Sequence, residues 1–169
     1  RRNQKFDALT VDLIRKTAGT VHREIRDEKK PDLAFPVRSL RNVSYSQKTR
    51  YFEMGRQKKV RTLTVNTVKS FAQTLRMMGL SKELVEGNDF ATKRDAYYQS
   101  KNWEEARFDE QTESDAVMDD IEALFSVQGV SREQLRFIPD EQGGAVAGRL
   151  VVLDPDRETG EIERIDCTR

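Results

Sequence analysis

The first thirty residues carry apolar side chains at every third or fourth position, with charged residues between them. These positions are Phe6, Leu9, Leu13, Val21 and Ile25. Such spacing puts apolar side chains on one face of a helix. We therefore expect an amphipathic helix over residues 1–30, interrupted near Gly19 and ended by Pro31.

The period changes between Pro31 and Arg61. The runs LAFPV, NVSY and RYFEM are short, rich in β-branched or aromatic residues, and separated by polar turns. This pattern predicts two or three strands. At least one of them lies at a sheet edge, because Pro36 has no N–H to donate to a neighbouring strand.

Helical spacing returns at Thr64–Met78. The predicted buried stripe of this helix consists of Val65, Val68, Phe71 or Ala72, Leu75 and Met78. Thr62 or Thr64 is the expected cap, and Gly79 the expected end. Three more helices are predicted at Ser81–Gly87, at Phe90–Trp103 with Thr92 as its cap, and at Glu110–Phe125 with Thr112 or Ser114 as its cap. The inward side chains of the last helix are Val117, Ile121, Leu124 and Phe125.

The C-terminal part reads as strands and turns. We expect two strands, at Leu135–Pro139 and Ala145–Leu153, joined by a DEQGG turn. A further strand is expected at Glu161–Cys167, after a turn at Asp154–Gly160. Helices followed by a small hairpin outline a winged helix-turn-helix. The expected fold class is α+β: a CAP-like winged helix-turn-helix domain with an N-terminal helix, a β-hairpin extension and a C-terminal β-hairpin.

Charge is balanced in total, with 30 basic and 29 acidic residues, but it is unevenly distributed. Between residues 38 and 61 there are eight basic residues and one acid, Glu53; between 104 and 122 there are nine acids and one base, Arg107. Such asymmetry favours an anionic partner for one face, first of all nucleic acid. A solvated basic hairpin whose charges only prevent edge-to-edge aggregation explains the basic segment equally well.

The composition argues against several other classes of protein. One cysteine, Cys167, rules out an internal disulfide framework, and one histidine, His22, argues against a zinc site. No apolar run has the length of a membrane span, and no signal peptide is visible. We expect a soluble chain of a reducing compartment, with no membrane partner.

The segment Phe90–Trp103 carries the candidate chemistry. On a helix, Arg94 and Tyr98 share a face at i and i+4, and Lys101 follows three residues later, whereas Tyr97 pairs with Lys93. A free phenol has a pKa of about 10, and a nearby cation favours its charged form. The fork of an arginine suits phosphate. The alternative is a tyrosine at the edge of the core, covered by arginine and lysine stems.

These residues also carry a family resemblance. TKRDAYYQSKNW, followed by FDEQTESDAVMDDIE, resembles the catalytic helix-turn-helix of the A subunit of type IIB DNA topoisomerases (topoisomerase VI), which the meiotic double-strand-break transesterase shares. The similarity extends through FPVRSLRNVSY and VRTLTVNTVKSFAQTLRMM to the IDC near the end. The expected divisions are residues 1–61 as the N-terminal helix and basic strands, 62–153 as the catalytic-tyrosine domain, and 154–169 as the start of a linker to a Toprim domain beyond Arg169.

The resemblance implies a mechanism. Tyr98 attacks a DNA phosphodiester and becomes joined to the 5′ end, and Arg94 holds the scissile phosphate. Two A subunits cut opposite strands, an ATP-binding B subunit drives strand passage, and Mg²⁺ is bound by the Toprim domain rather than by this chain, so the chain alone is expected to be inactive. The expected location is the cytoplasm, at the nucleoid.

The acidic helix Glu110–Phe125 is a poor candidate for entering a DNA groove, because phosphate repels it. The expected DNA-facing residues are instead Arg56, Lys58, Lys59, Arg61, Lys93 and Lys101, with contacts mainly to the DNA backbone. Two other functions stay open: a non-enzymatic winged-helix DNA-binding or regulatory module, and a protein-interaction domain that docks through the Phe6–Ile25 helix.

Overall fold

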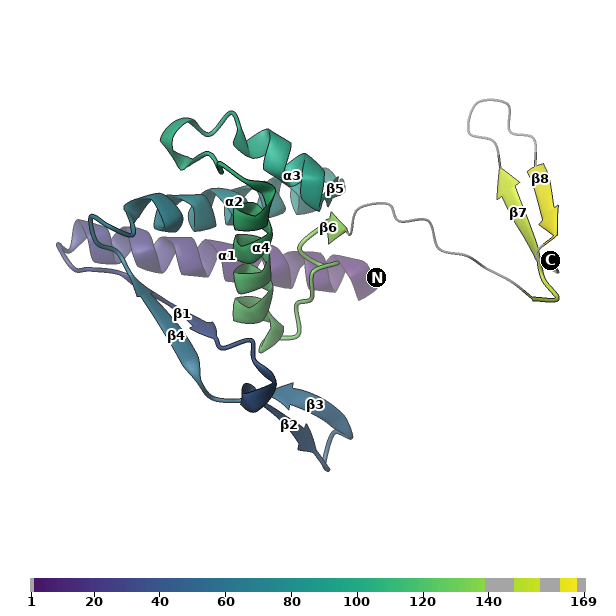
Figure 1. Ribbon diagram of the computed structural model, residues 1–169, viewed down its shortest axis with the longest axis horizontal. Helices are drawn as coiled ribbons and strands as arrows, with labels where there is room; N and C mark the ends of the chain where they lie inside the picture. The colour runs from purple at the N-terminus through teal and green to yellow at the C-terminus, as the bar shows by residue number, and fades with distance from the viewer. Residues whose placement is uncertain (1, 139–147, 156–161, 167–169) are drawn as a thin grey trace.

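A computed structural model describes residues 2–138, 148–155 and 162–166 (Figure 1). The fold is mixed α+β, as predicted, with four α-helices and four two-stranded sheets in these ranges. The helices are α1 (Arg2–Arg26), α2 (Val68–Gly87), α3 (Lys93–Ser100) and α4 (Gln111–Ser126), with short 3₁₀ turns η1 (Leu40–Asn42) and η2 (Glu104–Ala106). The strands are β1 (Asp32–Pro36), β2 (Val43–Ser46), β3 (Tyr51–Met54), β4 (Lys58–Thr62), β5 (Ala91–Thr92), β6 (Phe137–Ile138), β7 (Val151–Pro155) and β8 (Ile162–Asp166).

The N-terminal helix is continuous, so the predicted interruption near Gly19 is wrong. A glycine costs a helix only about 1 kcal/mol. Ile14 and Val21, on either side of it, are both buried, and α1 packs along α2. Tertiary burial therefore outweighs the weak propensity of one glycine. No helix in the described part of the chain is long and apolar enough to cross a membrane.

Helix α2 joins two helices that the sequence predicted separately, so Gly79 does not end it. Met77, Met78 and Leu80 are buried around this glycine, so the core holds the helix together across it. The helix begins later than predicted, with Thr67 as its N-cap residue, and Val65 is 92% exposed rather than buried. It ends where the backbone of Asn88 turns left-handed, with φ of 52°.

Two clusters of buried apolar side chains hold the elements together. The larger lies among α1, α2, α3, α4 and the segment after α4; its fully buried members include Met77, Met78, Phe108, Met118, Ile121, Val130 and Leu135. The smaller joins α1, β1 and α2 through Val21, Leu33, Phe35 and Phe71. Helix α4 begins after Glu110, so neither Thr112 nor Ser114 is its cap, and Ser114 is buried.

The basic region forms two antiparallel ribbons, β1–β4 and β2–β3. Strand β4 (KKVRT) was not among the predicted strands, because it has one aliphatic residue and no apolar alternation; main-chain pairing with β1 defines it. Asn42 is buried at the junction of the ribbons. Its side-chain amide donates to the Val37 carbonyl at 2.8 Å and accepts from the Gln57 N–H at 3.1 Å.

The C-terminal strands pair differently from the prediction. Strand β6 pairs in parallel with β5, and β7 pairs with β8 (Figure 1), so among the described residues there is no hairpin between 135–139 and 145–153. The reason is burial: Leu135 and Phe137 are almost fully buried in the helical core, which places β6 against the start of α3. The predicted DEQGG turn lies outside the described residues.

Candidate active site

Helix α3 is fixed at its start by a reciprocal cap. The Thr92 hydroxyl accepts the Asp95 N–H at 3.0 Å, and the Asp95 carboxylate accepts the Thr92 N–H at 3.1 Å. This is the capping-box arrangement, and it confirms Thr92 as the cap, although Asp95 was not singled out from the sequence. Ala96 and Ser100 are buried, so the opposite face of the helix is turned to solvent.

Arg94 and Tyr98 lie together on this outward face. The Tyr98 hydroxyl accepts hydrogen bonds from both Nε and Nη2 of Arg94, each at 3.3 Å, and the side chain is 52% exposed. The guanidinium carbon lies 5.7 Å from the centre of the tyrosine ring. An accessible phenol oxygen therefore lies beside a permanent cation, as the i, i+4 spacing predicted.

Tyr97 has a different environment, although its ring centre is only 5.5 Å from that of Tyr98. Its hydroxyl donates to the Asp109 carbonyl at 3.0 Å. The Lys101 ammonium lies 4.2 Å from the Tyr97 ring centre and donates to the carbonyls of Phe108, at 2.7 Å, and Asp109, at 3.2 Å. Tyr97 and Lys101 thus hold α3 against the loop that leads to α4.

The remaining expectations for the cations of α3 need correction. Lys101 was predicted to join Arg94 around Tyr98, but it lies four residues after Tyr97 and packs on that ring instead. Lys93 was predicted to pair with Tyr97, yet its ammonium lies 3.9 Å from the carboxylate of Asp115 on α4. Of the three cations, the structure brings only Arg94 to the Tyr98 hydroxyl.

Arg61, one of the predicted DNA-facing residues, is bound within the protein. Its guanidinium bonds to the Thr74 hydroxyl and the Asp120 carboxylate, each at 3.0 Å, and lies 5.0 Å from the centre of the Phe35 ring. The side chain is only 16% exposed. Arg61 therefore ties β4 to α2 and α4, and an intramolecular carboxylate already neutralises its charge.

Arg56, Lys58 and Lys59 are exposed and lie in β4 or in the turn before it. Figure 1 shows the β2–β3 ribbon and α3 toward opposite ends of α4, with β1 and β4 beside that helix. The expected DNA-facing residues therefore divide between the β1–β4 ribbon and α3.

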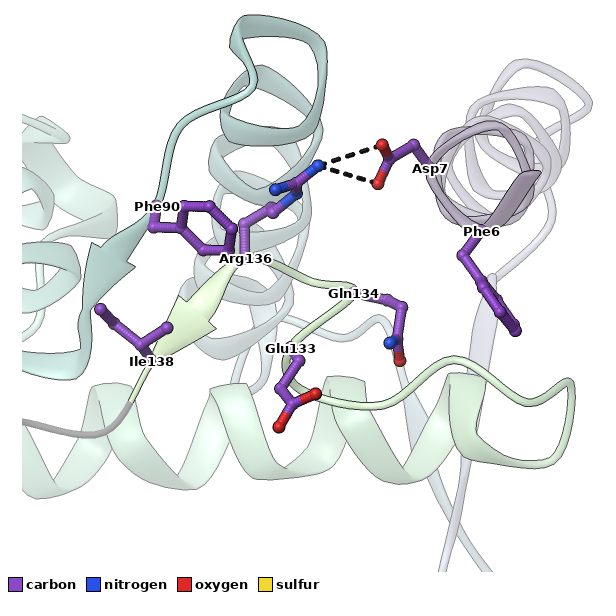
Figure 2. A pocket seen from close by; sticks show the side chains of 7 residues that line it. All are labelled: Phe6, Asp7, Phe90, Glu133, Gln134, Arg136 and Ile138. Carbon is purple, nitrogen blue, oxygen red and sulfur yellow. Dashed lines mark hydrogen bonds and ion pairs between the residues drawn. The ribbon is translucent and has the colours of Figure 1, made fainter. Parts of the chain in front are cut away.

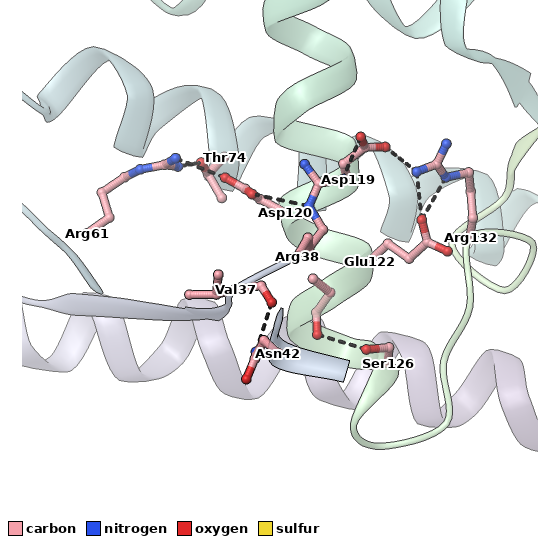
Figure 3. A network of polar contacts seen from close by, with 11 residues as sticks. Val37, Arg38, Asn42, Arg61, Thr74, Asp119, Asp120, Glu122, Ser126 and Arg132 are labelled. Atoms are coloured by element: carbon pink, nitrogen blue, oxygen red, sulfur yellow. Dashed lines mark hydrogen bonds and ion pairs between the residues drawn. The ribbon is translucent and has the colours of Figure 1, made fainter. Parts of the chain in front are cut away.

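The acidic helix α4 is largely neutralised by arginines from distant segments (Figure 3). Arg38 lies 2.7 Å from Asp119, and Arg132 contacts both Asp119 and Glu122. Burial raises the pKa of Asp119, but the Arg38 hydrogen bond and the charges of Arg132 and Arg38 outweigh burial and hold that pKa below its usual value of 3.8. No local pattern predicts these pairs, because Arg38 and Asp119 are 81 positions apart.

A second polar feature that was not predicted from the sequence lies beside the start of α1 (Figure 2). A hollow of about 380 Å³ is lined by Phe6, Asp7, Phe90, Glu133, Gln134, Arg136 and Ile138. The Arg136 side chain is buried; it bonds to Asp7 at 3.0 Å and lies 4.5 Å from the Phe90 ring centre. These contacts join α1 to the segments before β5 and at β6, so Arg136 has a structural role.

The described residues contain no group of three or more His, Cys, Asp or Glu side chains that could hold a metal ion. The chemistry available here is that of the phenol and guanidinium on α3.

Comparison with known proteins decides the family. Residues 69–136 match the family described as type IIB DNA topoisomerase, and residues 140–169 match the all-beta domain in the DNA topoisomerase VI alpha subunit. The chain belongs to the type IIB DNA topoisomerase family. The first match includes all of α3 and α4, and with them Arg94 and Tyr98.

Proteins named as the A subunit of type 2 DNA topoisomerase 6 are similar to nearly the whole chain. The protein of Methanocaldococcus jannaschii is 43% identical over 152 residues, which cover 90% of this chain and 40% of that protein. Those of Archaeoglobus fulgidus and Methanosarcina mazei are 31% and 29% identical, over 87% and 99% of this chain. The chain is thus a homologue of the topoisomerase VI A subunit that spans about two fifths of the length of these relatives.

Proposed function

We propose that this chain is the DNA-cleaving region of a topoisomerase VI-type A subunit, with Tyr98 as its nucleophile. The observation that carries the proposal is the exposed Tyr98 hydroxyl with two Arg94 nitrogens 3.3 Å away. Tyr97 is a weaker candidate, because its hydroxyl already donates to the Asp109 carbonyl. Membership of the type IIB family supports the same assignment.

The proposed step is a transesterification. The Tyr98 oxygen attacks the phosphorus, and the bond between phosphorus and the 3′ oxygen breaks. The phenol loses its proton to solvent, and the departing 3′ oxygen takes a proton from solvent and leaves as a hydroxyl. The 5′ phosphate is then esterified to tyrosine, so the reverse attack by the 3′ hydroxyl restores DNA without another energy source. Arg94 contributes by holding phosphoryl oxygens whose negative charge grows in the transition state.

The whole protein's partners follow from the same proposal. Two A subunits cut opposite strands of a duplex, an ATP-binding B subunit drives passage of a second duplex, and a Toprim domain supplies Mg²⁺, all in the cytoplasm at the nucleoid. The catalytic domain in this proposal lies within residues 62–153, while strand β7, which the boundary at 153 divides, pairs with β8 beyond it. Helices α2, α3 and α4 form its helical part.

The test joins this chain to the remainder of a topoisomerase VI-type protein of the same family, supplies its B subunit, ATP and supercoiled DNA, and traps protein–DNA adducts with denaturant. Tyr98→Phe is expected to reduce adducts at least about 10³-fold, since no hydroxyl remains to attack. Tyr97→Phe is the matched control and keeps most of them.

Adducts that survive in Tyr98→Phe and vanish in Tyr97→Phe would refute the assignment of the nucleophile. A wild-type assembly that binds DNA but never forms adducts would instead support a non-enzymatic DNA-binding module.

A further inference from the structure

The β2–β3 hairpin carries an exposed aromatic face that the tyrosine site does not use. Tyr45 and Phe52 are directly opposite each other across the two strands. Their ring centres lie 5.5 Å apart in an edge-to-face arrangement, and the side chains are 55% and 76% exposed. Large apolar groups gathered at a protein surface commonly mark an interaction site.

The aromatic pair is not covered by the helical body. A hollow of about 500 Å³ lies beside Phe52 and Glu53, bounded on its other side by Ser126 and Val127 at the end of α4. Val127 is itself 59% exposed. A ligand therefore has room to approach the ring of Phe52.

The charges around this face are uncompensated. Of the eight basic residues between 38 and 61, Arg38 and Arg61 pair with carboxylates of α4. The other six form no ion pair with any residue that the structure describes: Arg41, Lys48, Arg50, Arg56, Lys58 and Lys59. The one acid of the segment, Glu53, accepts a hydrogen bond from Thr49 at 2.7 Å. The hairpin and the adjoining ribbon thus present net positive charge.

The hairpin is held firmly where it leaves the β1–β4 ribbon. Besides its bonds to Val37 and Gln57, the buried Asn42 accepts the Gly55 N–H through its main-chain carbonyl. A Cβ on Gly55 would lie 2.3 Å from the Asn42 side-chain oxygen, so this position has no room for a side chain. The aromatic face is therefore presented on a fixed base.

We propose that the Tyr45/Phe52 face is a DNA-binding surface distinct from the tyrosine site. Phosphate neutralises the six cations, and the two rings contact bases or sugars; basic grooves with aromatic platforms bind nucleic acid in this way. A protein partner with an acidic apolar surface is the alternative. Six cations between Arg41 and Lys59, with no ion pair to the described part of the chain, match the dense and regular charge of DNA better.

The position of the hairpin indicates which DNA it contacts. It and α3 lie toward opposite ends of α4 (Figure 1), whose 16 residues span about 24 Å at about 1.5 Å per residue. At about 3.4 Å per base pair, that corresponds to about seven base pairs. The hairpin thus binds DNA flanking the phosphate that Tyr98 attacks, in so far as the proposed function holds.

The test measures binding by the 169-residue chain itself, without a partner and without cleavage. Fluorescence anisotropy is recorded with a labelled duplex of about 30 base pairs and with one of its strands alone. The double variant Tyr45→Ser/Phe52→Thr is expected to bind about tenfold more weakly to at least one of the two. Tyr51→Ser is the matched control, because Tyr51 is 74% exposed on the opposite face of the same hairpin, and it should change affinity less than about twofold.

Two further measurements keep the proposal testable if the double variant unfolds. Ultraviolet crosslinking of the unmodified chain to DNA that contains bromodeoxyuridine should map to residues 43–54. Lys48→Ala/Arg50→Ala should reduce the dependence of log Kd on log salt concentration by about one for each phosphate that is no longer bound.

Each outcome decides the proposal. Loss confined to the single strand identifies stacking on unpaired bases, and loss confined to the duplex identifies a groove contact. Unchanged affinity of the folded double variant for both DNAs, with crosslinks outside residues 43–54, overturns the proposal, and impaired binding of a B subunit would then assign the face to a protein. Adduct formation is scored separately in the assembled complex, so failure of the Tyr98 assignment leaves this result intact.

Discussion

Arginines occur in two regions of this molecule with opposite consequences. On α3, Arg94 donates to the hydroxyl of the exposed Tyr98. Along α4, Arg38, Arg61 and Arg132 are bound to carboxylates. The comparison teaches that the place of an arginine in the fold, beside an exposed phenol or between a helix and its neighbours, decides what it contributes. The first region should govern chemistry and the second should govern stability.

Of the two arginine regions, the one on α3 should give the larger effect, through Arg94. Arg94→Ala should lower the rate of adduct formation in the assembled complex about 10²–10³-fold, the loss typical of removing one group that stabilises transition-state charge. Arg94→Lys should recover part of the rate, because an ammonium keeps the charge and loses the fork. The free energy of unfolding should change by less than about 1 kcal/mol, since the site is exposed. An unchanged cleavage rate in single-turnover assays would contradict this role.

Arg61 should behave in the opposite way. Arg61→Ala leaves Asp120 with only the longer contact to Arg38, at 3.9 Å, and removes the contact with Phe35, so we expect a loss of about 2 kcal/mol in the free energy of unfolding. Lys58→Ala, at an exposed position on the opposite face of the same strand, is the control and should cost less than about 0.5 kcal/mol. Urea unfolding measures both. Equal small losses would mean that the α4 network does not stabilise the fold.

Tyr97 sharpens the comparison at the site itself. Tyr97→Phe removes the hydrogen bond to the Asp109 carbonyl and should lower the free energy of unfolding by about 1 kcal/mol. Tyr98→Phe removes an exposed hydroxyl and should cost less than half as much. Thermal or urea unfolding of the two variants measures both losses in the free energy of unfolding. A larger loss in Tyr98→Phe than in Tyr97→Phe would argue against a structural role for the Tyr97 hydroxyl.

The smallest effect concerns pH. The pKa of Asp119 is lower in the folded chain than its usual value, so the carboxylate stabilises the fold above about pH 4 and that contribution is lost as pH falls through the folded-state pKa. The stability difference between wild type and Asp119→Asn should therefore shrink between about pH 5 and pH 2. Urea unfolding across this pH range measures the stability difference. A difference that stays constant would show that the contribution of Asp119 to stability does not depend on its charge.

Local signals in the sequence predicted local structure well. The cap at Thr92 and the Arg94–Tyr98 pairing depend on residues three or four apart, and both are present. The prediction for Lys101 was wrong because both tyrosines are within helical spacing of it: Tyr98 lies three residues before Lys101 and Tyr97 four, and the structure places Lys101 on Tyr97. Helical propensity failed at Gly79, where burial of neighbouring side chains outweighs one weak helix former.

Long-range partners could not be predicted. Arg61 meets Asp120 across 59 positions, and Arg136 meets Asp7 across 129, with no periodicity that links them. Strand β4 has no apolar alternation, so only its pairing with β1 defines it. The winged hairpin was predicted from the order of the segments, whereas burial of Phe137 decides where β6 pairs.

The most direct test of the central claim is to locate the phosphotyrosine in wild-type protein. DNA adducts trapped in the assembled complex are digested with nuclease and trypsin, which yields the peptide from Asp95 to Lys101 with both tyrosines. Tandem mass spectrometry then assigns the residual nucleotide to one ring. We predict that it is attached to Tyr98; attachment to Tyr97, or to a residue outside α3, would contradict the account.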